Sequence, residues 1–332
     1  EGRRLVEQAR RQVALLVGGD PKAVTFTSGG TETNQTVLNP VIQFGAVKRR
    51  FSPLFVSAIE HPCVLSGGRF AKDAINFLPV DQNGVVDLAA LEAMIAMLDA
   101  PYVSVMAANN ETGVLQPLGE IARLVHARGG FFHVDAVQAA GKVALDLFDC
   151  EADVMTLSAH KMGGPQGAGA IVRRLAGTGI APLLLGGGQE LGYRAGTENV
   201  AALAGFGAAA EAALSEITGE TGLRDALERG VKALSPQVKV FGEAVARLPN
   251  TSCFSLPNKR AETAVIAYDM AGVAVSSGSA CSSGKVGASH VLKAMGVDDN
   301  VAKGVIRVST GWNTTAEDIE AFLAVTARLL AL

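Results

Sequence analysis

The segment Ser158-Ala159-His160-Lys161 places a lysine directly after an apolar run and just before the glycines at 163 and 164. An amine among small residues at the end of a strand can be held near its neutral form, and it can attack an aldehyde to form a Schiff base. A lone lysine on a turn is more often a solvated surface residue. Lys161 taken by itself therefore does not decide the chemistry.

Asp135 follows a second apolar run, residues 131–134. A carboxylate at the end of a buried strand is costly unless it meets a cation or hydrogen-bond donors. A protonated pyridine nitrogen would be such a cation, and the carboxylate would keep the ring protonated so that it can draw electrons. The alternative is an ordinary helix N-cap, which is a common role for aspartate in that place.

The segment Ser28-Gly29-Gly30-Thr31-Glu32-Thr33-Asn34 has the composition of a phosphate-binding turn. Glycines let backbone N–H groups approach an anion, and a helix that follows would add the positive end of its dipole. A Gly-Gly-Thr turn is also a plain connection from a strand to a helix. This motif indicates a phosphate site only in combination with others.

The four cysteines, Cys63, Cys150, Cys253 and Cys281, are far apart and form no CxxC pair. This spacing supports neither a disulfide framework nor a zinc site, and it favours a reducing compartment. Cys281 lies in the Gly/Ser-rich stretch 276–285, which predicts a loop with an exposed thiol, whereas Cys253 has the apolar neighbours of a structural cysteine. Cys63, close to His61, is the rival nucleophile.

Short apolar runs that alternate with helical patterns must position these residues. The runs are residues 23–26, 54–58, 102–106, 131–134, 154–157 and 169–172, and residues 118–128 show one of the helical patterns. Such an alternation predicts a mostly parallel sheet covered by helices on both faces, with ligands at the carboxyl ends of the strands. We place a large domain at residues 1–220 and a smaller α+β domain at residues 221–332.

The totals fit a well-buried enzyme of two domains. The chain has 332 residues, 48% hydrophobic and 18% charged, with a net charge of −3. The basic runs are too small for a nucleic-acid footprint, and no apolar stretch is long enough to span a bilayer, so we expect neither nucleic-acid binding nor a membrane role. The chain begins at Glu1 without a methionine or a signal-peptide pattern, and we expect that a segment before it is missing.

The motifs in combination resemble one family over essentially the whole chain. In chain order they are Gly30-Thr31, Glu60-His61, Asn109-Asn110-Glu111-Thr112-Gly113, Asp135 with Gln138, His160-Lys161 and Arg194-Ala195-Gly196-Thr197-Glu198-Asn199. This order closely resembles the class V aminotransferase family of fold-type I pyridoxal-phosphate enzymes, and within it the NifS/IscS-type cysteine desulfurases. The resemblance implies a large domain with a mostly parallel seven-stranded sheet flanked by helices, a smaller α+β domain, and a homodimer.

The resemblance also implies a role for each residue around pyridoxal 5'-phosphate. Lys161 would carry the cofactor as a Schiff base, Asp135 would face the ring nitrogen, Gln138 would bind the phenolic oxygen, and His61 would stack on the ring and take part in catalysis. The phosphate would be held by Gly30, Thr31, Ser158 and His160, with Thr197 reaching it from the second subunit. Asn110 would contact the cofactor and, together with Arg307, the substrate carboxylate, which suits the planar fork of arginine.

Cys281 selects the subgroup, because its stretch resembles the desulfurase loop whose cysteine takes sulfur as a persulfide. The implied reaction converts L-cysteine to L-alanine in the cytoplasm and passes the sulfur to an acceptor, either an iron–sulfur scaffold protein or a thiolation partner. The alternatives are a selenocysteine lyase, an aminotransferase or another class V enzyme on the same scaffold, and a catalytically silent assembly subunit. The family's usual opening segment, Leu-Asp-Asn-Ala-Ala-Thr-Thr-Pro, is absent here.

Overall fold

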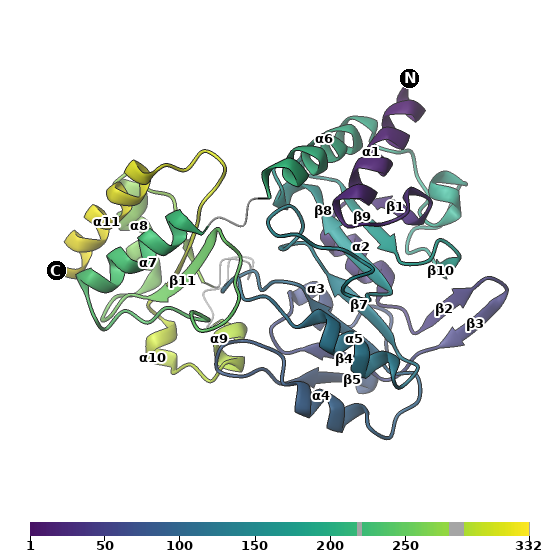
Figure 1. Ribbon diagram of the computed structural model, residues 1–332, viewed down its shortest axis with the longest axis horizontal. Helices are drawn as coiled ribbons and strands as arrows, with labels where there is room; N and C mark the ends of the chain where they lie inside the picture. Colours follow the sequence, from purple (N-terminus) through teal and green to yellow (C-terminus); the bar gives the residue numbers. More distant parts are fainter. Residues whose placement is uncertain (218–220, 279–288, 332) are drawn as a thin grey trace. The chain divides into compact units, whose positions relative to one another are not determined.

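The structure is a computed structural model in which residues 1–217, 221–278 and 289–331 are described (Figure 1). It divides into two compact units. The first comprises Glu1–Pro79, Val86–Ala107 and Gln116–Thr218, and the second comprises Val80–Val85, Ala108–Leu115 and Gly219–Leu332. Two short segments that lie within the first 220 residues thus belong to the second unit, and one of them carries Asn110.

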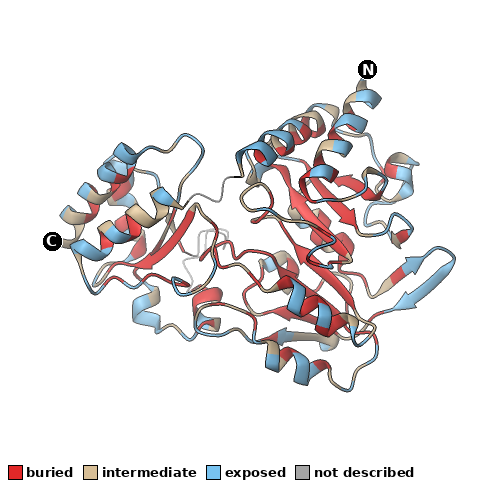
Figure 2. Ribbon diagram, in the orientation of Figure 1, coloured by how far each residue is buried: buried red, intermediate tan, exposed pale blue. Residues whose placement is uncertain are grey.

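A seven-stranded sheet forms the centre of the first unit and confirms the predicted mostly parallel architecture. Five of its strands, β5, β4, β6, β7 and β8, are mutually parallel, whereas β9 runs antiparallel to both β8 and β1. In spatial order the strands are β1 (Val24–Thr27), β9 (Gly169–Arg173), β8 (Val154–Ser158), β7 (Phe131–Asp135), β6 (Tyr102–Met106), β4 (Leu54–Ser57) and β5 (Ile75–Leu78). All residues of β4, β6, β7 and β8 are buried (Figure 2). Because both faces of these strands are covered, their sequences are nearly continuous apolar runs.

Helices complete the first unit. They are α1 (Gly2–Leu16), α2 (Gly30–Val37), α3 (Pro62–Leu65), α4 (Leu88–Ile95), α5 (Leu118–His126) and α6 (Val200–Glu216), with the 3-10 turns η1 (Pro21–Ala23), η2 (Lys72–Ala74), η3 (Ala159–Lys161) and η4 (Gln189–Gly192). Helices α1 and α6 pack side by side (Figure 1). Their approach needs Gly207, where a Cβ would lie 2.6 Å from the Cα of Ala9. In the described part of the chain, no helix is long and apolar enough to cross a membrane.

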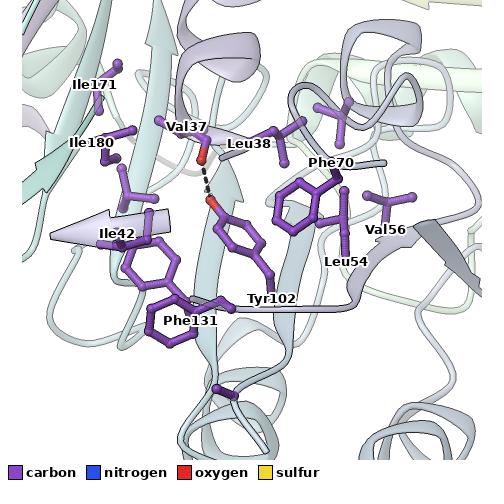
Figure 3. Close-up of a cluster of buried hydrophobic side chains, with 14 residues drawn as sticks. Val37, Leu38, Ile42, Leu54, Val56, Phe70, Tyr102, Phe131, Ile171 and Ile180 are labelled. Atoms are coloured by element: carbon purple, nitrogen blue, oxygen red, sulfur yellow. Dashed lines mark hydrogen bonds between the residues drawn. The ribbon is translucent and has the colours of Figure 1, made fainter. Parts of the chain in front are cut away.

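A cluster of buried aromatic and aliphatic side chains fixes α2 against the sheet (Figure 3). Phe131 of β7 and Tyr102 of β6 pack with ring centroids 5.2 Å apart. The Tyr102 hydroxyl donates a hydrogen bond of 2.7 Å to the carbonyl of Val37, the last residue of α2. The core thereby sets where α2 lies, and α2 carries two of the predicted phosphate-binding residues, Gly30 and Thr31.

A small three-stranded sheet of the first unit was not predicted from the sequence. It has the order β10 (Thr178–Ile180), β2 (Val41–Phe44) and β3 (Val47–Arg50), with antiparallel pairing throughout. All four residues of β3 are exposed (Figure 2). Its sequence, Val-Lys-Arg-Arg, therefore lacks the apolar alternation by which half-buried strands are identified.

Two consecutive residues of η4 adopt left-handed backbone angles although neither is glycine. Glu190 has φ 48° and Leu191 has φ 55°. Arg10 of α1 binds both carboxylate oxygens of Glu190, each at 2.8 Å, and the backbone N–H of Phe26 in β1 donates to the same carboxylate at 2.8 Å. This ion pair ties the turn to α1 and to the edge of the sheet.

The second unit is a three-stranded antiparallel sheet with helices, which agrees with the predicted α+β character. Its sheet has the order β11 (Thr251–Ser255), β13 (Val305–Ser309) and β12 (Ser276–Ser277). Its helices are α7 (Gly222–Leu234), α8 (Ala261–Met270), α9 (His290–Ala294), α10 (Asp299–Ala302) and α11 (Ala316–Ala331). Helix α11 packs on α7 and α8, and the stacked rings of Tyr268 and Phe322, with centroids 5.0 Å apart, lie in the core.

Candidate active site

The carboxyl ends of four strands, β1, β4, β7 and β8, bring the predicted cofactor residues of the first unit to one edge of its sheet. Strands β4, β6, β7 and β8 are parallel, and β1 runs in the same direction because it is antiparallel to β9, as β8 is. His61 follows β4, Asp135 ends β7, and Lys161 ends the 3-10 turn directly after β8. These side chains therefore share the edge at which open α/β sheets bind ligands.

The amino end of α2 has the features of an anion site. Its N-cap is Gly29, with φ 148°, which provides no side-chain cap for the first turn. A Cβ on Gly30 would lie 3.2 Å from a methyl group of Val137 and 3.6 Å from the Cβ of Ser158, so this backbone comes close to the end of β8. The Ser158 hydroxyl lies 2.9 Å from Nδ1 of His160. Uncapped N–H groups, a hydroxyl and an imidazole fit a phosphate group.

Asp135 is buried, with 5% of its surface exposed, and both of its carboxylate oxygens accept a hydrogen bond. The backbone N–H of Val137 donates to Oδ1 at 3.0 Å, and Nδ2 of Asn34 donates to Oδ2 at 2.7 Å. Burial raises the pKa of Asp135, and these two hydrogen bonds act in the opposite direction. A buried carboxylate of this kind gains most from a cationic partner.

Gln138 lies one turn beyond Asp135 with its side-chain amide oriented by Lys142. The ammonium of Lys142 donates to Oε1 of Gln138 at 3.0 Å and to its backbone carbonyl at 2.9 Å. Because an ammonium only donates, Oε1 must face Lys142. The Nε2 donors therefore point away from Lys142, as binding to a phenolic oxygen requires.

His61 caps the short helix α3 and contacts Cys63. Its Nδ1 accepts the backbone N–H of Cys63 at 3.2 Å and lies 2.9 Å from Sγ of Cys63. Burial raises the pKa of Cys63 to about 11, although hydrogen bonds from Asn34 and Thr31 act against this. The thiolate is the nucleophilic form of cysteine. A thiol kept protonated is therefore poorly suited to be the nucleophile, which weakens the case for Cys63.

Lys161 and Thr197 differ in exposure. Lys161 is half-buried, whereas Thr197 is exposed on the segment between η4 and α6. The neighbouring Arg194 pairs with Glu32 of α2 at 2.9 Å, so this segment is tied to the amino-terminal turn of α2 within its own chain. A hydroxyl exposed on an anchored segment is what the predicted contact with a second subunit requires.

Arg307 and Asn110, the predicted carboxylate-binding pair, lie together in the second unit. Arg307 is on the central strand β13, and its Nη1 donates to the backbone carbonyl of Asn110 at 2.7 Å. Among the described residues, Nε of Arg307 and Oδ1 of Asn110 are buried without a hydrogen-bond partner. The Arg307 donor suits a carboxylate. A carbonyl oxygen does not, so Asn110 would have to meet a carboxylate through Nδ2 and not through Oδ1.

Glu111 is a buried carboxyl group of the second unit to which the sequence assigned no role. The Ser289 hydroxyl donates to its Oε2 at 2.5 Å, and a Cβ on Gly278 would lie 3.7 Å from the same oxygen. Burial raises the pKa of Glu111 to about 7, against the influence of Ser289 and Arg307. Gly278 and Ser289 flank residues 279–288. Cys281, the predicted nucleophile, lies in that segment and thus outside the described residues.

Two further buried groups of the first unit were also missed. Glu60 precedes His61, and burial raises its pKa to about 8, helped by the nearby Asp135. His133, on β7, is wholly buried, and burial lowers its pKa to about 3. Each lies within two residues of a predicted site residue, Glu60 beside His61 and His133 near Asp135. The signal that could have identified them is the presence of a titratable side chain within an apolar strand or at its end.

Comparison with known proteins gives one consistent result. The family model described as Aminotransferase class-V matches residues 1–322. A cysteine desulfurase of Cereibacter sphaeroides is 42% identical over 97% of this chain and 84% of its own length. The human cysteine desulfurase is 38% identical over 96% of this chain and 71% of its own.

Solved structures agree with these relatives. The X-ray structure of a NifS-like protein from Rickettsia africae superposes with a TM-score of 0.88 at 35% identity, covering 100% of this chain and 89% of that one. The uncapped amino end of α2 and the buried Asp135 also fit the phosphate and the ring nitrogen of pyridoxal phosphate. The chain belongs to the class-V aminotransferase family of pyridoxal-phosphate-dependent enzymes.

Proposed function

We propose that this enzyme is a cysteine desulfurase, which converts L-cysteine to L-alanine and retains the sulfur as a persulfide on Cys281. The observation that carries the proposal is the buried carboxylate of Asp135, held by two donors at the sheet edge where Lys161 also lies. The identity of 42% to a cysteine desulfurase supports the choice of reaction. The remaining residues are assigned in turn below.

Lys161 is the proposed attachment point of the cofactor and the group that moves the proton of the substrate α-carbon. When bound, pyridoxal phosphate draws electrons from the bonds at that carbon. Asp135 pairs with the ring nitrogen, Gln138 donates to the phenolic oxygen through Nε2, and His61 stacks on the ring. The turn of Gly30 and Thr31, together with Ser158 and His160, holds the phosphate.

Arg307 is the proposed partner of the substrate carboxylate. Its Nη1 is engaged by the carbonyl of Asn110, which fixes the guanidinium, and its buried Nε is a donor without a described partner. A carboxylate at this position would satisfy that donor and neutralise the arginine charge. Asn110 would join in this binding as a donor through Nδ2.

Cys281 is the proposed acceptor of the sulfur atom. Its thiol and the thiol of L-cysteine together become a persulfide on the protein and a C–H bond in alanine, so atoms balance and no external oxidant or reductant is needed. The C–S bond at the β-carbon is replaced by a C–H bond whose proton comes from the Cys281 thiol, and Lys161 returns the α-proton to the α-carbon. Cys63 is the weaker candidate because its raised pKa, about 11, keeps it in the thiol form.

A homodimer, a sulfur acceptor and a cytoplasmic location complete the proposal. Thr197 is exposed on its anchored segment and would reach the phosphate of a second copy of the chain. The acceptor of the persulfide would be an iron–sulfur scaffold protein or a thiolation partner. The described cysteines, Cys63, Cys150 and Cys253, are unpaired thiols, as a reducing compartment favours.

Alanine release from L-cysteine by the purified protein, supplied with pyridoxal phosphate and a thiol reductant, tests the proposal. We expect about one alanine per sulfide released, and a mass increase of one sulfur atom on Cys281 when the reductant is omitted. Cys281→Ala should release almost no alanine, while still binding the cofactor. Full alanine release by Cys281→Ala, or a persulfide found only on Cys63, would show that the assigned nucleophile is wrong.

A further inference from the structure

Asn34 of α2 contacts three other elements through its side-chain amide. Its Nδ2 lies 2.7 Å from Oδ2 of Asp135 in β7 and 3.3 Å from Sγ of Cys63 in α3, and its Oδ1 lies 2.6 Å from the hydroxyl of Thr156 in β8. The side chain is buried. Each hydrogen-bonding group of this amide therefore has a partner on a different element.

The contact with Asp135 sets the orientation of this amide. An ionised carboxylate only accepts hydrogen bonds, so the group that faces it must be the NH₂ of Asn34. Oδ1 then faces Thr156 and must receive its hydroxyl proton. A flipped amide would place Oδ1 against the Asp135 carboxylate, and two acceptors would repel each other. The orientation of Asn34 is the one that an ionised Asp135 requires.

The same reasoning extends to His133. Because the single proton of the Thr156 hydroxyl goes to Asn34, its oxygen must accept from Nε2 of His133, 3.0 Å away. Nδ1 of His133 then has no proton and accepts from the hydroxyl of Ser104 at 2.8 Å. His133 is thereby fixed as the neutral Nε2–H tautomer, which agrees with the burial that lowers its pKa to about 3.

All donors in this series of hydrogen bonds point toward Asp135. The order is Ser104, His133, Thr156, Asn34 and Asp135. Hydrogen bonds in series polarise one another, and a donor whose own acceptor is engaged donates more strongly. The strengthened hydrogen bond is the one that Asn34 donates to Asp135, the carboxylate which we assign to the cofactor's ring nitrogen.

The second N–H of Asn34 reaches the residue that contacts His61. Sγ of Cys63 accepts from Asn34, and the Cys63 thiol has its own proton to give to Nδ1 of His61, 2.9 Å away. Nδ1 of His61 also accepts the backbone N–H of Cys63. His61 is then the Nε2–H tautomer as well. Cys63 thus links Asn34 to His61.

We propose that Asn34, oriented by Thr156 and His133, is the positioning residue that keeps Asp135 an ionised acceptor for the ring nitrogen of pyridoxal phosphate. The inference rests on the role proposed above for Asp135, but it does not depend on the substrate or on Cys281. It assigns Cys63 a connecting role rather than a chemical one. It also gives the buried His133 a function in cofactor binding.

Nitrogen NMR of ¹⁵N-histidine-labelled protein without cofactor tests the direction of the series. We expect His133 and His61 to be neutral Nε2–H tautomers at pH 7. Thr156→Val keeps the shape of the side chain but removes the hydroxyl, and it should move His133 toward the Nδ1–H tautomer, which donates to Ser104. Thr156→Ser restores the hydroxyl and should restore the Nε2–H form. An Nδ1–H or a charged His133 in the wild type would overturn the inference.

Cofactor affinity tests the effect on Asp135. The dissociation constant of pyridoxal phosphate, measured by absorbance or fluorescence titration, should rise about 10- to 100-fold in Asn34→Ala, which is the range for losing a hydrogen bond to a charged group. Thr156→Val should weaken binding by a smaller factor, and Thr156→Ser should remain within about twofold of the wild type. The matched control is Thr36→Val, also buried in α2, whose hydroxyl bonds, among the residues that the structure describes, only the carbonyl of Glu32 within the helix.

Besides the NMR result, two affinity results would overturn the inference. One is an Asn34→Ala protein that binds the cofactor as tightly as Thr36→Val does. The other is equal cofactor affinity of Thr156→Val and Thr156→Ser. This second comparison decides the matter if Asn34→Ala fails to fold. Neither measurement uses cysteine. A protein that gives the expected tautomers and affinities but releases no alanine would contradict the proposed reaction and leave the role of Asn34 intact.

Discussion

The proposed cofactor-binding carboxylate of the first unit and the proposed substrate-binding pair of the second unit differ in how completely they are hydrogen-bonded. In the first unit, both carboxylate oxygens of Asp135 accept hydrogen bonds, and the series behind one of them continues to Ser104. In the second unit, Nε of Arg307 and Oδ1 of Asn110 are buried without a partner among the described residues. Asp135 is thus fully hydrogen-bonded without a ligand, whereas Arg307 and Asn110 each keep one buried polar atom for a ligand.

This difference corresponds to two kinds of binding. A cofactor that stays with the enzyme is served by groups whose orientation is fixed in advance, because rigid groups lose little entropy when it binds. A substrate that must enter and leave is served by groups that gain a partner on binding. A buried donor left unsatisfied costs about 1–3 kcal/mol, and the substrate recovers that cost when it binds.

The largest expected effect comes from removing the lysine of the first unit. Lys161→Ala should lower alanine release by about 10³-fold or more at saturating L-cysteine, because it removes both the attachment of the cofactor and the proton transfer. Lys48→Ala, an exposed lysine in β3 of the same unit, is the control and should keep wild-type activity. Borohydride reduction followed by peptide mapping should find the cofactor on Lys161. Trapping on another lysine would contradict the assignment.

A change at Arg307 should affect the substrate and spare the cofactor. Arg307→Leu should raise KM for L-cysteine about 10- to 100-fold, because a charge-assisted contact contributes about 1.5–3 kcal/mol. The dissociation constant of pyridoxal phosphate should not change. Arg260→Leu, an exposed arginine of the same unit with 70% of its side chain accessible, is the matched control. A KM equal to that of the control would mean that Arg307 has only a structural role in β13.

Each unit has a buried carboxyl group, Glu60 or Glu111, that should make the free energy of unfolding depend on pH. The pKa of Glu60 is raised from 4.5 to about 8 in the folded chain, so the folded state binds more protons than the unfolded state between these values. The free energy of unfolding therefore falls as pH rises through this range, with a slope of at most about 1.4 kcal/mol per pH interval of one. Glu60→Gln should flatten this decline while keeping both hydrogen bonds to Oε1, from Ser57 and Met106.

Glu111 should also make the free energy of unfolding fall as pH rises, but over a narrower pH range, because its pKa is raised only to about 7. Glu111→Gln should flatten the fall in stability between about pH 4.5 and 7 and leave the region above pH 7 unchanged. Urea unfolding followed at several pH values measures both variants against the wild type. Parallel curves for wild type and Glu60→Gln would show that Glu60 is ionised in the folded chain.

The smallest expected effect is that of Cys63→Ala. The backbone N–H of Cys63 still donates to Nδ1 of His61 in this variant, so the ring keeps this hydrogen bond. Alanine release should stay within about fivefold of the wild type, as expected for the loss of a weak thiol hydrogen bond. Loss of nearly all activity in Cys63→Ala, with cofactor binding intact, would instead place the sulfur chemistry in the first unit.

The sequence predicted those parts of the fold that have a strong local signal. Strands β6, β7 and β8 are continuous apolar runs, because they are buried on both faces, and they were identified within a residue or two. Strand β5, with only one of its four residues buried, and the exposed β3 carry no such signal and were missed. The buried strands are therefore enough to predict the type of sheet. The edge strand β5 and the hairpin of β2 and β3 could not be predicted in this way.

The residues of the site were predicted by type and motif, but their supporting contacts could not be. Asn34 lies inside the predicted phosphate motif, yet its role depends on Asp135 and Thr156, which are 101 and 122 residues further along the chain. Arg307 and Asn110 are 197 residues apart, and only the assembly of the second unit brings them into contact. The direction of a hydrogen bond depends on all of its neighbours at once, and a linear pattern does not contain that information.

The turn at Glu190 and Leu191 has a consequence for how this chain can vary. Left-handed angles at two non-glycine residues cost of order 1–3 kcal/mol each, and the ion pair with Arg10 offsets this cost from outside the turn. Substitutions at position 10 and in the turn are therefore coupled. Leu191, a residue that is 84% exposed, can become glycine with a gain in stability. A chain that has made this change can afterwards lose Arg10 at lower cost. The order in which such mutations arise thus decides which of them is tolerated.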